Sequence, residues 1–91
     1  MVERPQYIQK AADTVAKARL TREDIRRTQK PGDPDREERL DSILDEIDAA
    51  MKPVRSAIGA IAWGRSEFED QLRAVSQDLQ YERRQLKKMK R

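Results

Sequence analysis

Three aspartates with helical spacing are the first group in this sequence whose side chains could do chemistry. Asp41, Asp45 and Asp48 follow one another at intervals of four and three residues, which places their carboxylates on one face of a helix. Carboxylate oxygens are the ligands that Ca²⁺ and Mg²⁺ prefer. A solvated acidic face beside a basic neighbouring helix produces this pattern far more often. We therefore predict no metal site at these aspartates.

The side chains that most enzymes use are missing from this chain. It contains no histidine and no cysteine, so acid–base catalysis would fall to carboxylates or lysines. The glycines at 32, 59 and 64 lack the spacing of a phosphate-binding loop. Aromatic residues make up only 4% of the chain, which leaves little to line a substrate pocket. We predict a non-enzymatic protein with no catalytic residues, no cofactor and no small-molecule substrate.

The basic side chains form the second group that could do chemistry. Residues 1–30 carry eight basic and four acidic side chains, residues 31–82 carry six and thirteen, and residues 83–91 carry six and none. The two basic stretches could contact phosphates of DNA or RNA. The candidate contacts are Arg19, Arg22, Arg26, Arg27, Lys30, Arg83, Arg84, Lys87, Lys88, Lys90 and Arg91. The other interpretation is that the C-terminal stretch stabilises a helix end and pairs with the acidic segment.

A turn divides the chain into the elements that must position these groups. The prolines at 31 and 34 flank Gly32, so residues 31–34 are predicted to form a turn between an N-terminal helical segment, 1–30, and residues 35–91. In the first segment, apolar residues recur at helical spacing. Thr21 could cap a second short helix, with Leu20 and Ile25 forming a hydrophobic staple. One kinked helix over 6–29 and two helices divided near Leu20 both fit.

After the turn, apolar residues follow one heptad frame over two runs. The positions are Leu40, Leu44, Ile47, Met51, Val54, Ile58 and Ile61, then Phe68, Leu72, Val75, Leu79, Glu82, Leu86 and Met89. Only Arg65 and Glu82 interrupt the frame. Such sustained alternation of four and three predicts coiled-coil packing. Pro53 lies inside the first run and predicts a kink.

The second segment folds either as one long helix or as a hairpin. Gly64 suits a helix C-terminus, and Ser66 with Glu69 forms a capping box, which predicts a turn at 63–66. Antiparallel packing brings the acidic residues beside the basic tail, and it arises in a hairpin or in an antiparallel dimer of straight helices. The predicted fold class is all-α: an antiparallel helical hairpin with an additional N-terminal helix, as a small three-helix bundle or an antiparallel dimer.

Protein binding is the function that these observations favour. Trp63 lies at the predicted tip among small apolar residues and would be a natural interface anchor. The predicted interface residues are Trp63, Ile61, Phe68, Leu72, Leu79 and Leu86. We predict an interaction module that associates with itself, as a homodimer, or docks onto a larger protein as an adaptor, assembly factor or inhibitor. The alternative is a DNA- or RNA-binding accessory protein that uses the two basic stretches.

Hydropathy bears on the location of the protein. The mean hydropathy is −1.02, and no run approaches the roughly 18 apolar residues of a membrane span. No N-terminal apolar stretch resembles a signal peptide. We expect a cytoplasmic protein without a membrane partner.

Overall fold

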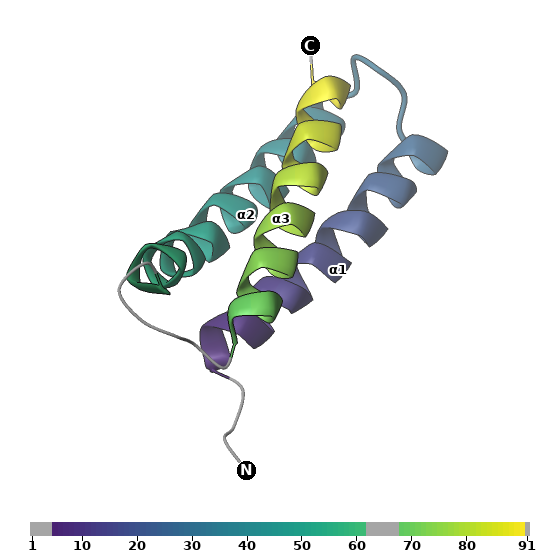
Figure 1. Ribbon diagram of the computed structural model, residues 1–91. Helices are drawn as coiled ribbons and strands as arrows, with labels where there is room; N and C mark the ends of the chain where they lie inside the picture. Colours follow the sequence, from purple (N-terminus) through teal and green to yellow (C-terminus); the bar gives the residue numbers. More distant parts are fainter. Residues whose placement is uncertain (1–4, 62–67, 91) are drawn as a thin grey trace.

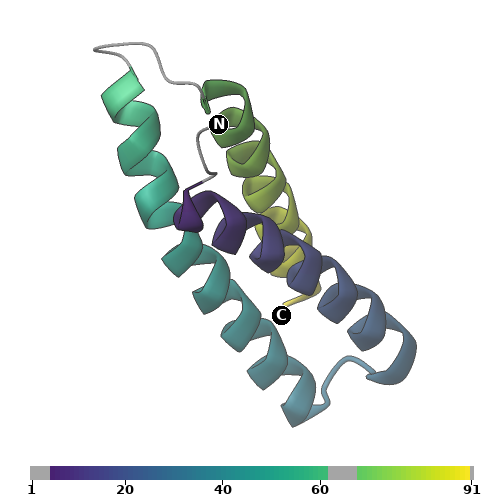
Figure 2. The same cartoon turned by 90° about the horizontal axis from the view of Figure 1, so that it is seen from below.

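Three helices pack against one another in a computed structural model, which describes residues 5–61 and 68–90 (Figure 1). The helices are α1 (Gln6–Thr28), α2 (Pro34–Ile61) and α3 (Glu69–Met89). The helices α1 and α3 run in the same direction and α2 runs against both (Figures 1 and 2). The predicted all-α bundle is confirmed, with no strand in the described residues. Because the chain reverses between α2 and α3, residues 35–91 form a hairpin and not one straight helix.

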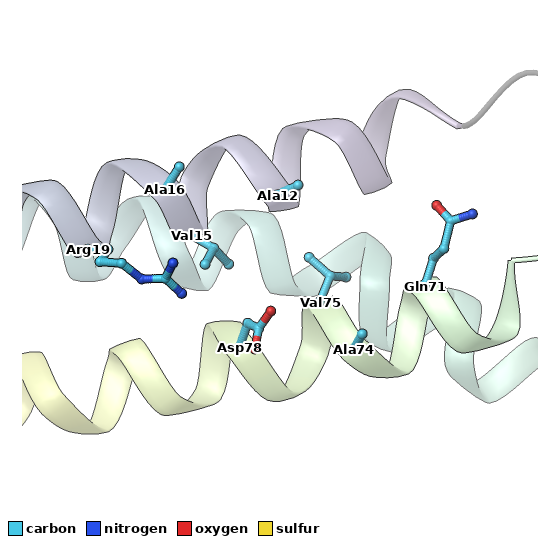
Figure 3. Close-up of a pocket in the computed structure, with 8 residues that line it drawn as sticks. All are labelled: Ala12, Val15, Ala16, Arg19, Gln71, Ala74, Val75 and Asp78. Atoms are coloured by element: carbon cyan, nitrogen blue, oxygen red, sulfur yellow. The ribbon is translucent and has the colours of Figure 1, made fainter.

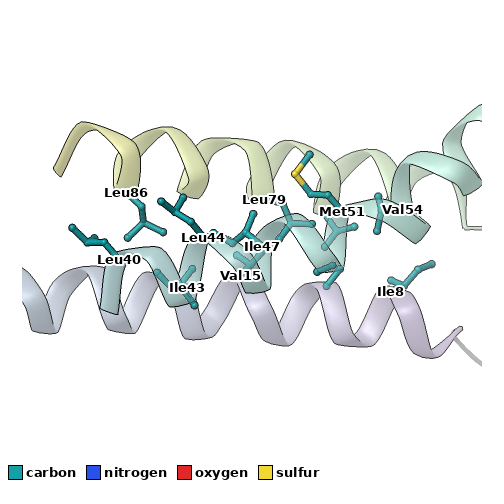
Figure 4. Packing of buried hydrophobic residues seen from close by; sticks show 14 of the residues in the cluster. Ile8, Val15, Leu40, Ile43, Leu44, Ile47, Met51, Val54, Leu79 and Leu86 are labelled. Carbon is teal, nitrogen blue, oxygen red and sulfur yellow. The ribbon is translucent and has the colours of Figure 1, made fainter. Parts of the chain in front are cut away.

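The predicted heptad frame supplies most of the core (Figure 4). In α2 the buried frame positions are Leu40, Leu44, Ile47, Met51 and Val54. Ile43 and Ala50, which lie outside the frame, are buried as well. They widen the apolar face of α2 because α2 packs against two helices, whereas a two-stranded coiled coil needs only a narrow seam.

The helix α1 is continuous, which decides between the two alternatives for the N-terminal segment. Thr21 lies inside the helix, and Leu20 is exposed and forms no staple with the buried Ile25. The hydroxyl groups of Thr14 and Thr28 donate to the carbonyl oxygens four residues earlier, at 2.8 and 2.7 Å. Each bond satisfies a threonine hydroxyl within the helix framework, at Thr14 in the interior of α1 and at Thr28 in its last turn.

The turn between α1 and α2 is formed by the proline and glycine residues that the sequence predicts there. Gly32 has a φ of +97°, a conformation that a side chain would disfavour. The Asp33 carboxylate accepts a hydrogen bond from the backbone N–H of Asp35 at 2.9 Å, and the Asp33 carbonyl accepts from Arg36 at 3.1 Å. Pro34, predicted as the end of the linker, is the first residue of α2, where its missing N–H costs nothing.

Pro53 lies inside α2, and the helix continues through it. In Figure 2 the ribbon of α2 changes direction part-way along the helix. A proline ring removes one backbone hydrogen bond and crowds the preceding turn, which favours a bend in a helix that contains it. The helix has no break at Pro53.

Ion pairs join the helices along their edges. Arg83 of α3 pairs with Asp48 of α2 at 2.9 Å, and Lys90 pairs with Asp41. The acidic segment thus faces the basic tail across the hairpin, as the charge pattern predicts. On the other side of α2, Lys17 of α1 pairs with Glu46 at 2.7 Å. None of the helices, over the residues that the structure describes, combines the length and the apolar character that crossing a membrane requires.

Candidate interaction surface

A shallow groove runs between α1 and α3, with α2 behind it (Figure 3). Its volume is about 320 Å³. The lining residues are mostly small: Ala12, Val15, Ala16 and Arg19 from α1, and Gln71, Ala74, Val75 and Asp78 from α3. The alanines at 12, 16 and 74 leave the groove open between the two helices, and Arg19 crosses it at one end to Glu82 of α3. A helix can approach closely where alanine lines the contact.

Two large hydrophobic side chains extend this apolar strip onto the surface. Leu20 is 68% exposed and Tyr81 is 48% exposed, and they are the large hydrophobic residues that the described part of the chain leaves exposed. Leu20 continues the row of Ala12 and Ala16 at a spacing of four residues, and Tyr81 follows Ala74 by seven. These five residues define what we term the α1–α3 face.

A buried ionic cluster fixes the level at which the two helices meet. Glu82 of α3 is 1% exposed, although it occupies an apolar position of the heptad frame. Arg22 Nε lies 3.3 Å from Glu82 Oε2, and Arg19 Nε lies 3.6 Å from Glu82 Oε1. The Arg22 guanidinium also lies 5.8 Å from the centre of the Tyr81 ring. Residues 19–22 therefore face residues 81–82, so Leu20 and Tyr81 lie at the same level of the bundle.

The Arg22–Glu82 pair is closely packed, but its hydrogen bonding is incomplete. Arg22 Nη2 donates to Glu82 Oε1 at 3.4 Å, but Arg22 Nε and Glu82 Oε2 are buried without a well-directed hydrogen bond. The side chain of Arg22 is only 13% exposed. Each buried charge is stabilised by its partner. If one group were removed, the other would remain buried without water to solvate its charge.

Five of the eleven predicted nucleic-acid contacts form ion pairs with acidic residues of the same chain. Besides Arg19 and Arg22, three form ion pairs with acidic neighbours: Arg27 with Asp24, Arg83 with Asp48, and Lys90 with Asp41. Arg91 lies outside the described residues. The remaining candidates are exposed and make no ion pair with a described residue: Arg26, Lys30, Arg84, Lys87 and Lys88. All five lie at or near the ends of α1 and α3, which share one end of the bundle (Figure 1).

The predicted interface residues are largely taken up by the core. Leu72, Leu79 and Leu86 are fully buried within the chain, and Phe68 is partly buried against the same core. Ile61 is the last residue of α2. Trp63 and the predicted turn at 63–66 lie outside the described residues. The apolar surface that the structure does expose is the α1–α3 face.

Sequence reasoning missed this face, although a signal for it exists. Tyr81 is a large aromatic residue outside the heptad frame, in a chain with few aromatic residues. Leu20 stands outside the buried stripe of α1, although its spacing from Ile25 also fits a hydrophobic staple. A large apolar residue that fits no core frame is the pattern that marks a surface contact in such a polar sequence.

The aspartate row has a structural role in the hairpin. All three aspartates are exposed; Asp41 and Asp48 each pair with a cation of α3, whereas Asp45 makes no ion pair with a described residue. In the described parts of the chain, no three acidic side chains gather closely enough to hold a metal ion.

Two of the interhelical pairs shift the pKa of a participating group. The pKa of Asp24 is lowered, chiefly by the hydrogen bond from Arg39, whose Nη2 lies 2.9 Å from the carboxylate. The pKa of Lys90 is raised, chiefly by its hydrogen bond to Asp41. Each shift favours the charged form of the group concerned, the Asp24 carboxylate and the Lys90 ammonium.

No protein-family model, curated protein or solved structure is significantly similar to this chain. Any functional assignment therefore depends on the surfaces described above.

Proposed function

We propose that this protein is a non-enzymatic interaction module that binds a protein partner through the α1–α3 face. The observation that carries the proposal is the exposure of Leu20 and Tyr81 at one level of the bundle, beside a groove lined by alanines. The rest of the described surface leaves no other large hydrophobic side chain exposed, so these two stand out.

The chemistry of the face suits a helical partner. Burial of a leucine and a tyrosine side chain releases about 25 cal/mol for each Å² of apolar area removed from water. Tyrosine also keeps a hydroxyl group for hydrogen bonding at the rim of a contact, which is one reason for its enrichment at interfaces. The alanines at 12, 16 and 74 allow the backbone of a partner helix to approach closely.

Substitution of the two exposed residues tests the proposal. Full-length protein, tagged at one end, is used to capture proteins from a nuclease-treated extract of its native cells, beside the variant Leu20→Gln with Tyr81→Gln. We expect the wild type to retain a stoichiometric protein, or further copies of itself, and the variant to lose at least tenfold of it. Both replaced residues are exposed, so helix content measured by circular dichroism should not change.

A matched variant on α2 controls for general surface effects. Glu38→Gln with Asp45→Gln replaces two exposed residues away from the α1–α3 face and should capture as the wild type does. Equal capture by the wild type and the Leu20/Tyr81 variant would contradict the proposal.

Nucleic-acid binding is the second candidate, favoured by one observation. The five exposed basic residues without an ion pair to a described residue lie at or near the ends of α1 and α3, at one end of the bundle. If this end binds phosphates, Arg84→Gln with Lys87→Gln and Lys88→Gln should weaken binding to DNA or RNA and reduce its salt dependence by about three counterions. Partner loss on nuclease treatment would favour this candidate over the first.

A further inference from the structure

We infer that the α2–α3 side of the bundle binds a small ligand that carries a diphosphate group, that is, two linked phosphates. The site is separate from the proposed function, because none of the residues that define the α1–α3 face lines it. It consists of two adjoining hollows in which arginine and lysine predominate.

The two hollows lie between α2 and α3, and each has a volume of about 280 Å³. They adjoin because Met51, Arg55 and Arg83 line both of them. Met51 is only 3% exposed, so it forms an apolar floor beneath the more exposed basic side chains. One hollow is completed by Gln80 and Arg84, and the other by Asp48 and Lys52.

Helical spacing gathers the basic side chains on the facing sides of the two helices. On α2, Lys52 and Arg55 lie three residues apart. On α3, Arg83 and Arg84 follow Gln80 by three and four residues, which places them on the same side of the helix. The antiparallel hairpin turns both sides toward the same hollows.

The charges around the hollows are not balanced within the chain. Nearer the start of α2 its aspartates pair with cations of α3, but Asp48 is the last acidic residue of α2. Asp48 is paired with Arg83 at 2.9 Å. The side chains of Lys52, Arg55 and Arg84 are exposed and make no ion pair with a described residue. Like charges that lie close together repel one another, and an anionic ligand would neutralise them.

The basic side chains present are those that suit phosphate oxygens. A guanidinium group is planar and donates two parallel hydrogen bonds to a phosphate, and a lysine adds a compact positive charge. Arg55 and Arg83 belong to both hollows, so they can contact two phosphates at once. Arg84 serves one hollow and Lys52 the other. This arrangement fits two linked phosphates, one in each hollow.

The shape of the site favours a small ligand over a nucleic-acid strand. The volume of each hollow is near the lower end for ligand sites, about 300 Å³. Strands are commonly bound by stacking of their bases on aromatic side chains, and none of the described residues that line the hollows is aromatic. Asp45 and Asp48 follow the site toward the start of α2, and their charges would repel a strand that continued along the groove.

Titration of the full chain with pyrophosphate tests the inference. Amide ¹H–¹⁵N spectra are recorded at low ionic strength, with orthophosphate and ADP as further ligands. We expect saturable binding of pyrophosphate or ADP that is about tenfold or more tighter than that of orthophosphate, because only a diphosphate reaches both hollows. The shifted signals should include those of Arg55 and Arg84. Tighter binding of ADP would identify the diphosphate of a nucleotide, and tighter binding of pyrophosphate would identify the free ion.

Two variants distinguish this site from an effect of net charge. Arg55→Gln with Arg84→Gln removes one cation from each helix and should weaken the binding of pyrophosphate about tenfold or more. Both residues are exposed, so helix content measured by circular dichroism should not change. The matched control, Arg26→Gln with Lys30→Gln, removes two exposed cations outside both hollows and should bind as the wild type does.

Several results would overturn the inference. Pyrophosphate and ADP that do not saturate the wild type at millimolar concentrations exclude the site. Equal losses in the two variants would show that binding follows net charge and not the hollows. Diphosphates that bind no tighter than orthophosphate would exclude two phosphate positions. If a single-stranded oligonucleotide binds through Arg55 and Arg84 while pyrophosphate and ADP do not, this side contacts nucleic acid and the inference fails.

Discussion

At the scale of single residues, the buried carboxylate of Glu82 is the most consequential departure from an apolar core. It lies in a heptad position between Leu79 and Leu86, where a hydrophobic residue would pack without help. Arg22 and Arg19 compensate its charge from the neighbouring helix. Such a group restricts how α1 docks, because only one rotation and one level of α1 bring both arginines to it.

We predict that Glu82→Leu destabilises the bundle although it makes the seam more apolar. The buried Arg22 would lose its counter-ion, and removal of one partner of a buried pair costs about 3 kcal/mol. The double variant Glu82→Leu with Arg22→Met should unfold with a free energy near the wild-type value or above it. Urea unfolding followed by circular dichroism measures the free energy of unfolding of the single and the double variant.

An exposed pair within α3 provides the comparison. Arg73 and Glu69 pair at 3.1 Å on the surface, and Arg73→Met should cost only about 0.5 kcal/mol. A cost for Glu82→Leu as small as this would mean that Arg22 reaches water once its partner is gone.

The lowered pKa of Asp24 makes a second prediction at this scale. A carboxyl group with a lowered folded-state pKa stabilises the fold above its unfolded value, near 3.8, and this contribution is lost as the pH falls through the folded-state pKa. Thermal melts of Asp24→Asn should therefore show a small loss of stability at pH 7, and the difference from the wild type should shrink below about pH 4. A difference that stays constant down to pH 2 would exclude the ionised pair as its cause.

At the scale of the elements, the turn between α1 and α2 depends on one glycine. Gly32 has a φ of +97°, and there is open space around the position that a Cβ would occupy. The cost of a side chain is therefore conformational and not steric with its neighbours. Gly32→Ala should destabilise the protein by about 1 kcal/mol.

Gly59 offers a matched comparison for this prediction. It lies inside α2, also with open space about the position of a Cβ. Gly59→Ala should stabilise the protein by about 0.5–1 kcal/mol, since alanine is the better helix former. The same substitution thus has opposite signs at the two glycines, which unfolding curves of both variants would check.

The sequence predicted α2 and α3 better than it predicted α1 and the α1–α3 face. The heptad positions from Leu40 to Leu86 are large and regularly spaced, so their burial follows from the pattern alone. In α1 the buried stripe contains two alanines and a threonine, and Thr21 resembles a cap as much as an interior residue. Its continuity depends on packing against α2 and α3, which local patterns do not encode.

Leu20 and Tyr81 stand out in the sequence, but their place on one face of the bundle could not be predicted, for a related reason. Which residues of α1 remain exposed depends on the rotation of α1 against the hairpin. The pairing of Arg22 with Glu82, sixty residues apart, sets that rotation. Two isolated charges at this separation carry no signal in a single sequence.

At the scale of the whole molecule, α1 packs on the hairpin to complete a three-helix bundle. The burial of Ile43 is a measure of this packing. Ile43 is 2% exposed although it stands outside the heptad seam between α2 and α3. We predict that Ile43→Ala lowers the free energy of unfolding by about 2–4 kcal/mol, as expected for a buried aliphatic residue. In a two-stranded coiled coil without α1, the same position would lie at the edge and cost little.

The exposed Leu20 supplies the control for this measurement. Leu20→Ala, studied at a concentration low enough to keep the chain monomeric, should change the free energy of unfolding by less than about 0.5 kcal/mol. Equal effects at the two positions would contradict the packing of α1 on α2.

Three helices, unlike two or four, leave the start of α1 and the finish of α3 at opposite poles of the bundle (Figure 1). Fluorophores placed at Gln6 and Met89 would be separated by about 30 Å along the axis of one copy. Energy transfer between the two fluorophores would report this separation, and segments joined to the two ends would be held apart by the length of the bundle.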